Sequence, residues 1–346
     1  MDLRELRFGV EVEMTGLTRV EAVQVAANYF GSRISFDGTY YDKHSTRDSQ
    51  GRKWTFMSDG SIQQQIWRDG EIVDVLGRDY EVELVTPVCG YEDIPTIQQL
   101  VDRLRRAGAL SNGSCGLHVH VDAAAFDARS LRNLVNIVAA KEDLLYKALG
   151  VRVDREYYCQ RMNTDFLQRL NLIRPRTREQ VSQVWYTEQP DSGHTVNDHY
   201  HKSRYRGLNL HSVFTKGTVE YRLFNSTVER TDQIKAYIQL CLAVSAQALN
   251  QRHAAHARTR SANEKYTFRT WLLHLGIIGE EFKEARACLL ERLDGNIAWK
   301  DPAQAERQKE RLRQQREAET QLDAQPEQQG RQEAGADAPA FTMTMM

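Results

Sequence analysis

The sequence predicts an α+β fold in which a largely antiparallel sheet packs under helices. Four separated segments alternate apolar and polar residues, which is typical of half-buried strands. Three Asp-Gly dipeptides, at residues 37–38, 59–60 and 69–70, are strong hairpin signals. The expected helices follow the strands at irregular intervals, so a doubly wound nucleotide-binding fold is not favoured.

The first third of the chain is expected to contain most of the hairpins. FGVEVEM (8–14) alternates cleanly as a strand, and the next helix begins at a capping box of Thr18 and Glu21 and ends at Gly31. Residues 34–87 carry the three Asp-Gly pairs among aromatic and β-branched residues. This combination indicates an antiparallel meander.

The rest of the chain is expected to be mainly helical around further strands. Pro95 stands in the first turn of a helix over residues 92–107. GLHVHVD (116–122) and TVEYRLF (218–224) alternate as strands. The remaining expected helices span residues 127–149, 154–187, 231–250 and 261–293, the last of them opened by Ser261 and Glu264.

Composition restricts the classes of partner. The 346 residues carry a formal net charge of -1, which gives no reason to expect binding to nucleic acid or to an acidic membrane. Five cysteines without a CxxC spacing suggest neither a disulfide framework nor a thiolate zinc site, and fit a reducing compartment. The N-terminus lacks an apolar signal core, and no run of about 18 apolar residues occurs. We therefore expect a cytoplasmic protein.

The four alternating segments share one design. Each places apolar side chains on one face and ionisable side chains on the other, because successive residues of a strand point to opposite sides. If the segments are neighbours in one sheet, the ionisable side chains meet on a common surface. These side chains are Glu11 and Glu13, Glu81 and Glu83, His118 and His120, and Glu220 and Arg222.

Such a surface would be strongly anionic. Unit charges about 4 Å apart repel by about 4 kcal/mol at an effective dielectric near 20, so clustered carboxylates either protonate or recruit cations. Glutamate oxygens suit magnesium, with manganese as the second choice; imidazole also admits zinc, but these segments contain no cysteine to favour it. The alternative is four unrelated strands whose polar faces are simply solvated.

Several common catalytic motifs are missing from the sequence. It contains no GxxxxGK[ST] phosphate loop and no GxGxxG after a strand, so any bound phosphate must be held by metals and arginines. It also contains no GxSxG elbow and no HExxH, which leaves serine-nucleophile and zincin mechanisms without support.

Four motifs in a fixed order carry a resemblance to a known family. They are Glu11-x-Glu13, Glu83-Leu-Val-Thr-Pro, Gly116-Leu-His-Val-His, and Asn209 followed by Thr218-Val-Glu-Tyr-Arg-Leu-Phe. In this order the sequence resembles the amidoligase family, carboxylate–amine ligases related to glutamate–cysteine ligase and glutamine synthetase. The resemblance covers about residues 7–250. It implies a glutamine synthetase-type catalytic domain with a curved sheet, and amide formation from a carboxylate phosphorylated by ATP.

The resemblance implies an amidoligase-like catalytic domain over residues 1–255 and a set of metal ligands. Beyond it, periodicity predicts a helical extension over 256–300, and composition predicts a charged Gln/Glu/Arg/Ala-rich tail, helical or disordered, over 301–346. Two or three magnesium ions would sit with ATP on the sheet. Their implied ligands are Glu11, Glu13, Glu83, Glu220 and His118.

Further roles follow from the same resemblance. Arg222 would steady the transferred phosphoryl group beside Glu220, since a guanidinium fork and metal ions are what phosphoryl transfer requires. The implied ATP-binding residues are His118, His120, Arg222 and Asn209. Either histidine could be the one near the phosphates. The implied catalytic residues are Arg222, Glu220 and Asp59.

Some of these residues have equally good structural explanations. Asp59 and Ser61 in SDGSI match a position near the substrate, but an Asp-Gly turn would also use them. Asn209 could be a buried amide that holds a loop. The segment 186–206 contains three histidines and three cations without apolar periodicity; its cations could close over ATP or an acidic substrate, or the loop could simply be solvated. The histidine spacing matches no usual zinc site.

Two other functions remain open at this level. A metal-dependent hydrolase could use the same glutamates and histidines to activate water, and a non-catalytic scaffold could bind nucleotide. Arg222 beside Glu220 favours the ligase. The expected substrates are small-molecule or peptide carboxylates and amines, whose identity lies in loops such as 40–53 and 186–206. The sequence leaves the oligomeric state open.

Overall fold

The computed structural model describes residues 1–323, which divide into two compact units at Ile297 and Ala298. The first unit contains an eight-stranded sheet in the order β2-β3-β4-β7-β1-β8-β10-β9, and every neighbouring pair is antiparallel. These strands are β1 (Phe8–Met14), β2 (Ser35–Phe36), β3 (His44–Arg47), β4 (Lys53–Met57), β7 (Val82–Val85), β8 (Gly116–Asp122), β9 (Leu208–Asn209) and β10 (Thr218–Asn225). The predicted α+β class with an antiparallel sheet is confirmed at this level.

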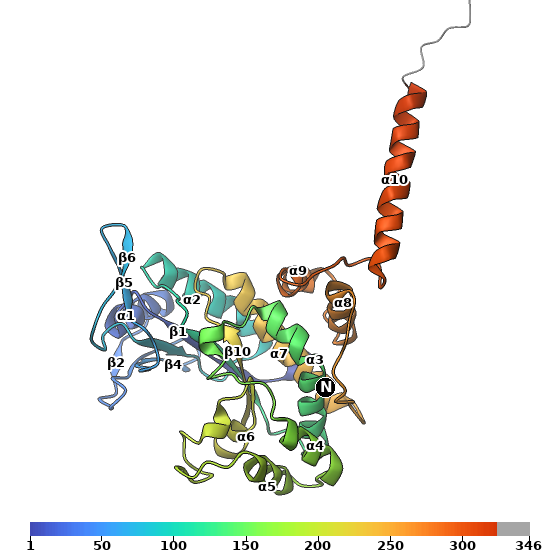
Figure 1. Ribbon diagram of the computed structural model, residues 1–346. Helices are drawn as coiled ribbons and strands as arrows, with labels where there is room; N and C mark the ends of the chain where they lie inside the picture. Colours follow the sequence, from blue (N-terminus) through green and yellow to red (C-terminus); the bar gives the residue numbers. More distant parts are fainter. Residues whose placement is uncertain (324–346) are drawn as a thin grey trace, which may run out of the picture. The chain divides into compact units, whose positions relative to one another are not determined.

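Helices cover the apolar face of the sheet. In the view of Figure 1, α1, α2 and α7 lie above the sheet, whereas α5 and α6 lie below it. The helices of the first unit are α1 (Arg19–Phe30), α2 (Ile94–Arg106), α3 (Ala128–Leu149), α4 (Thr164–Ile173), α5 (Arg178–Glu188), α6 (His211–Thr215), α7 (Thr231–Asn250), α8 (Glu264–His274) and α9 (Lys283–Leu290). Short 3-10 turns are η1 (Leu3–Glu5), η2 (Tyr91–Asp93), η3 (Val153–Arg155), η4 (Lys202–Arg204) and η5 (Glu280–Phe282).

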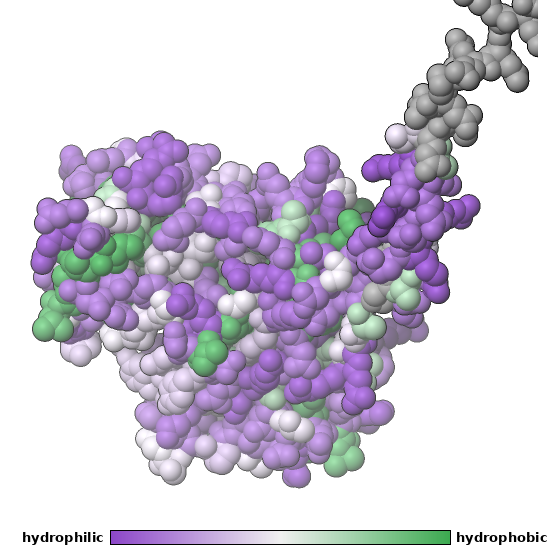
Figure 2. Space-filling view, turned by 45° about the horizontal axis from the view of Figure 1, so that its top comes forward, coloured by the Kyte–Doolittle hydropathy of each residue, from purple (hydrophilic) through white to green (hydrophobic). Residues whose placement is uncertain are grey.

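The four alternating segments occupy the centre of the sheet as direct neighbours, in the order β7-β1-β8-β10. Their apolar side chains, such as Val12, Leu84 and Val119, are completely buried. Burying an aliphatic side chain of this size contributes about 1.5–3 kcal/mol, which fixes the strand faces because a one-residue slip would expose the whole apolar row. The surface in Figure 2 is correspondingly mostly hydrophilic, with scattered apolar patches.

The expected helix ends of α1 are present. Thr18 and Glu21 form the reciprocal capping box, and Gly31 ends the helix in the left-handed conformation with φ 64°. Gly150 does the same for α3 with φ 58°. Local hydrogen bonding therefore sets these boundaries.

The meander expected over residues 34–87 is only partly right. Strands β2, β3 and β4 do form one, with Asp37–Gly38 between the first two. Asp69 and Gly70 turn a separate two-stranded hairpin of β5 (Gln65–Arg68) and β6 (Glu71–Asp74), with φ 52° and 85°. Asp59–Gly60 turns no hairpin, because β4 pairs with β7 and not with β5.

Two long helical segments are each interrupted. The segment 154–187 contains α4 and α5, and the segment 261–293 contains α8 and α9. Asn263, not Ser261, caps α8, because its side chain accepts from the Tyr266 amide. Gly276 and Gly279, at φ 85° and 87°, break the second segment.

The second unit begins at Ala298 and contains α10 (Pro302–Asp323), which carries almost no apolar side chains. The remainder of the predicted charged tail, residues 324–346, lies outside the described residues. Over residues 1–323, no helix has both the length and the apolar character needed to cross a membrane.

Candidate functional site

The floor of the candidate site is the polar face of the four central strands. Antiparallel register sets Glu11 opposite His118, Glu13 opposite Glu83, and Glu220 opposite His120. Directly opposed residues have Cβ atoms about 4.5–5.5 Å apart, so ionisable groups that lie far apart in sequence become close neighbours. The predicted common surface therefore exists.

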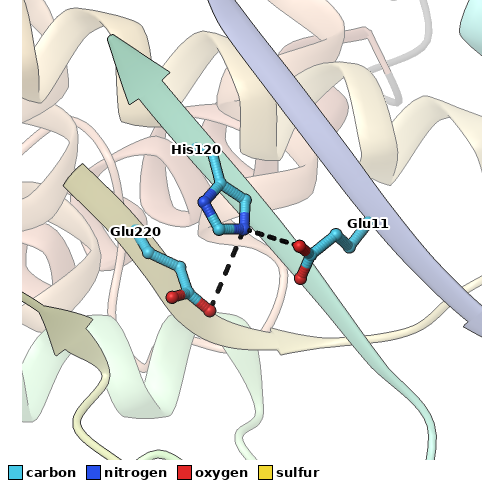
Figure 3. A group of neighbouring side chains, drawn as sticks. All are labelled: Glu11, His120 and Glu220. Carbon is cyan, nitrogen blue, oxygen red and sulfur yellow. Dashed lines mark ion pairs between the residues drawn. The ribbon is translucent and has the colours of Figure 1, made fainter. Parts of the chain in front are cut away.

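Three groups of side chains on this floor could hold a metal ion. In each, one ligand atom per residue lies within 4.8 Å of the others. Figure 3 shows one group, in which a side chain from each of β1, β8 and β10 points to a common centre. The groups are Glu11, His120 and Glu220; Glu11, Glu83 and His118; and Glu13, Asp59 and Glu83.

Two carboxyl groups of the floor hold their protons unusually strongly. Burial, with a smaller contribution from the nearby Asp59 charge, raises the pKa of Glu13 to about 7. Burial and then the Glu11 charge raise the pKa of Glu83 well above its usual value. A divalent cation would reverse this effect, because its charge stabilises the ionised carboxylates.

The other two carboxylates are already compensated by cations. Burial alone would raise the pKa of Glu11, but the charges of His120 and Lys216 and a hydrogen bond from His118 hold that pKa well below its usual value. The Glu220 pKa is lowered because the adjacent Arg222 guanidinium outweighs burial. The floor thus combines carboxyl groups of raised pKa with carboxyl groups of lowered pKa within one surface.

The histidines provide a test of whether a metal fits. Burial and then the Arg222 charge lower the pKa of His118 to about 4, so this imidazole is a neutral, potential ligand. Among residues 1–323, neither His118 Nε2 nor His120 Nε2 has a hydrogen-bond partner, although both are buried. His120 Nε2 lies 3.1 Å from Glu11 Oε1 without the alignment of a hydrogen bond. His120 is thus an ion-pair partner of Glu11, whereas His118 offers an unpartnered neutral nitrogen among carboxylate oxygens, which fits a magnesium or manganese ion.

A β-bulge shapes the site at Arg222. The register of β10 against β8 shifts between Tyr221 and Phe224, so Phe224, not Leu223, stands opposite Leu117. Arg222 Nη1 donates to Glu220, and the Arg222 backbone amide donates to Gly207 at 2.8 Å. Arg222 thus lies on the same strand face as Glu220, as the alternation predicts, and its buried guanidinium contacts the carboxylate floor.

Asn209 reaches the site indirectly. Its Nδ2 donates to Glu220 Oε2 at 2.7 Å, and its Oδ1 accepts from the His211 amide at 2.8 Å. Both ends of the amide are thus used within the protein. Asn209 orients Glu220, and its proposed contact with a nucleotide stays a prediction.

A cavity of about 750 Å³, cavity 1, opens above one end of the floor. Glu13, Glu83, Asp59 and Arg222 line its base. Its volume is that of a typical small-molecule site, between about 300 and 1,000 Å³. Its lining also includes Glu11, Tyr41, Lys43, His118, Arg155, Tyr200, Arg204, Tyr205 and Lys216.

A second cavity of about 490 Å³, cavity 2, lies at the other end of the floor. Both cavities are lined by Glu11 and Lys216, whose Nζ lies 3.7 Å from Glu11 Oε1. Gly9 lies on the same face of β1 as Glu11, and because it has no side chain it leaves space in cavity 2. The lining of cavity 2 is more apolar than that of cavity 1 and includes Phe8, Val85, Pro87 and Val88.

Comparison with known proteins identifies the family. The family model described as "Putative amidoligase enzyme" matches residues 4–245. The chain belongs to this family. This match agrees with the resemblance drawn from the four motifs.

Other comparisons are more distant. A crystal structure of a bifunctional glutathione synthetase from Pasteurella multocida matches with 11% identity and a TM-score of 0.37. The match covers 84% of this chain and 47% of that one, so the amidoligase-family chain spans about half the length of the synthetase. No curated protein matches.

Most sequence-predicted residues of this amidoligase-family chain gather on the floor. Asp59 agrees both with a structural role in the turn and with a role in the site. Its Oδ1 accepts from the Ser61 amide at 2.8 Å, and its carboxylate also belongs to one of the three groups that could hold a metal ion. Glu81 lies just before β7 and accepts from Ser58 Oγ at 2.6 Å, away from the three groups. Asp122, on the same strand as the histidines, is exposed and caps the Ala124 amide.

Part of the segment 186–206 lines cavity 1, but its histidines do not converge. Tyr200 OH lies 2.9 Å from Tyr41 OH, which joins this segment to the loop after β2 across cavity 1. His194 pairs with Asp191, and His201 is buried against Ser203. Within residues 1–323, the histidines of this segment therefore do not form a zinc-type group.

Sequence reasoning missed three cations of cavity 1 that stand outside the alternating strands. Lys216 follows α6, Arg155 ends η3, and Lys43 lies between β2 and β3. Arg204 of η4 belongs to the segment 186–206, whose cations the sequence analysis did single out. The aromatic residues of cavity 1 were missed for the same reason. Their only sequence signal is a local concentration of tyrosines and cations in the segments 40–43 and 199–206.

Proposed function

We propose that the protein is an ATP- and magnesium-dependent carboxylate–amine ligase, which forms an amide bond through an acyl-phosphate intermediate. We further propose that its sheet domain is of the glutamine synthetase type. The observation that carries the proposal is the meeting of Glu11, His120, Glu220 and the Arg222 guanidinium on one floor, in a chain that belongs to the amidoligase family.

The proposed metal ligands are Glu11, Glu13, Glu83, Glu220 and one or both histidines of β8. When bound, magnesium supplies charge that neutralises the phosphate oxygens and polarises the transferred group. Manganese fits the same oxygen and imidazole donors. Asn209 and Thr218 orient two of these ligands. Asn209 donates a hydrogen bond to Glu220, and Thr218 Oγ1 lies 3.1 Å from His120 Nδ1.

We propose that the nucleoside end of ATP enters cavity 2. This cavity is the more apolar of the two, and it adjoins the group of Glu11, His120 and Glu220. The phosphates would then extend along the floor past Lys216 toward Arg222. This direction leaves cavity 1 for the carboxylate and the amine.

In the proposed reaction, Arg222 stabilises the charge that spreads over the phosphoryl oxygens during transfer to the substrate carboxylate. The amine then attacks the acyl carbon, and phosphate leaves with the electrons of the broken carbon–oxygen bond. Asp59 stands at the edge of cavity 1 and is positioned to accept the proton that the amine loses. The closed Tyr41–Tyr200 contact limits access of water, which would hydrolyse the acyl phosphate.

The test is a screen for ADP release with magnesium against pooled carboxylic acids and amines. The unaltered protein should release ADP and phosphate in step with amide, and hydroxylamine should trap the acyl phosphate as a hydroxamate. Hydrolysis without nucleotide turnover would favour the metal-dependent hydrolase. AMP with pyrophosphate would indicate an adenylating enzyme, and nucleotide binding without any turnover would leave a scaffold.

The domain division and the location remain proposals. We propose a catalytic domain over residues 1–255 with a helical extension over 256–300. The packing of α9 against α7 within the first compact unit supports an extension that is attached firmly to the domain. Five free, buried cysteines support a reducing compartment such as the cytoplasm. The proposed substrates are small molecules or peptides.

A further inference from the structure

Arg155 is a buried cation that the proposed mechanism does not use. It ends η3, and only 3% of the residue is exposed. Its guanidinium donates from Nη1 to the Phe224 carbonyl and from Nη2 to the Arg222 carbonyl at 3.4 Å. Over residues 1–323, Arg155 forms no ion pair with a carboxylate. A charge this deeply buried normally has an anionic partner, so backbone carbonyls alone leave it undercompensated.

The neighbouring strand provides room for this guanidinium. A Cβ atom at Gly116 would overlap Arg155 Nη2 and would come within 3.0 Å of His118 Nε2. The glycine that opens GLHVHVD therefore admits Arg155 beside the metal-type groups. Burial lowers the pKa of Arg155, and the Glu13 charge opposes this effect.

The position of Arg155 indicates which substrate it faces. Arg155 and Glu13 both line cavity 1, and neither lines cavity 2. Arg222 also lines cavity 1, but its guanidinium is already paired with Glu220. Arg155 is thus the buried cation whose charge is free for a ligand at the end of cavity 1 away from the proposed nucleoside site.

We propose that Arg155 binds the carboxylate of the acyl substrate at the Glu13 end of cavity 1. A guanidinium presents two parallel N–H donors that match the two oxygens of a carboxylate. The adjacent rim suits an anionic substrate as well. Arg204 lies over the rings of Tyr200 and Tyr205, and Lys43 over Tyr41, and in the described chain neither cation is paired with a carboxylate. This inference rests on the proposed ligase function.

The experiment measures binding of acids and turnover separately. Acetate, glutarate and N-acetylated dipeptides are titrated into the full-length protein with magnesium and without nucleotide, and binding is followed by calorimetry. Arg155→Lys keeps the charge but loses the fork, and Arg155→Met removes the charge while keeping much of the stem. The matched control is Arg152→Lys, three residues away and exposed, whose guanidinium lies beside Gly113 and not Gly116.

We expect at least one acid to bind the unaltered protein, and both Arg155 variants to bind it about ten-fold or more weakly, as expected for a lost charge-assisted bond. In turnover, KM for the acid should rise while KM for ATP stays within about two-fold, whereas Arg152→Lys should change neither. Thermal melting checks that each variant is folded.

The outcomes separate the two proposals. A rise in KM for ATP with unchanged acid binding would make Arg155 a phosphate ligand and overturn the inference. Equal acid binding by the unaltered protein and Arg155→Lys, or no acid binding at all, would overturn it too. Acid binding that depends on Arg155, without ADP release from any pair of substrates, would support the anion site and refute the ligase.

Discussion

Glu13→Gln should remove a pH-dependent loss of stability from the metal-free protein. Glu13 is buried on the floor, and burial raises its pKa from 4.5 to about 7. Between these values the unfolded chain releases the proton while the folded chain retains it, so the free energy of unfolding falls as pH rises. Glutamine keeps an acceptor for the Gly116 amide, which donates to Glu13 Oε2 at 2.5 Å, but carries no proton to lose.

The size of the effect follows from the shift. One pKa unit corresponds to 1.36 kcal/mol, and a group that changes from 4.5 to about 7 destabilises the folded state by about 2.5 kcal/mol more at pH 8 than at pH 5. The Glu13 charge also contributes to the raised pKa of Glu83. Glu13→Gln should therefore lower the Glu83 pKa and reduce the pH-dependent loss of stability that Glu83 causes. The difference between the two proteins should therefore reach at least this magnitude.

The assay is urea unfolding of the unaltered protein and Glu13→Gln at pH 5 and pH 8, in chelator and again with magnesium. Without metal, the unaltered protein should lose about 2.5 kcal/mol more than the variant on going to pH 8. Magnesium should reduce this loss in the unaltered protein, because a bound cation stabilises the ionised carboxylate. Exposed Glu71, changed to Gln, is the matched control. Parallel pH profiles of the unaltered protein and Glu13→Gln would refute the reasoning.

Three further outcomes are expected. Arg222→Lys should lower turnover by about 10²-fold or more, since an ammonium cannot reproduce the planar fork, while thermal melting stays near that of the unaltered protein; undiminished kcat would remove Arg222 from the mechanism. Glu220→Gln should weaken magnesium binding in calorimetry by about ten-fold, and an unchanged affinity would show that the group of Glu11, His120 and Glu220 is not a metal site. Deletion after residue 300 should leave melting within a few degrees, because α10 belongs to the second unit and has almost no apolar surface to bury; a larger loss would make the tail structural.

The elements that sequence analysis predicted well depend on local physics. The capping box of Thr18 and Glu21 joins residues three apart, and the alternation of FGVEVEM depends only on the pleat of one strand. The errors arose where pairing is not local. The Asp59–Gly60 pair has the composition of a hairpin turn, yet β4 pairs with β7 some 25 residues later, and the turn faces cavity 1 instead.

The candidate site divides in the same way. Glu11, Glu13, His118, His120 and Glu220 could be selected from the sequence because each shares a strand face with another ionisable residue. The strand order needed to unite them could only be assumed. Asn209 illustrates the limit, since its partner Glu220 depends on the short pairing of β9 with β10.

The sequence by itself determined the chemistry of this protein: which side chains of each strand are polar, that carboxylates and imidazoles predominate among them, and where α1 begins and ends. Only the tertiary structure decided which three ligand atoms meet, that Asn209 donates to Glu220, and that Arg155 fills the space beside Gly116. Alternation and capping are set by neighbours along the chain, whereas these contacts join residues up to about 200 positions apart. Such contacts depend on strand order, register and helix packing, which the core as a whole selects.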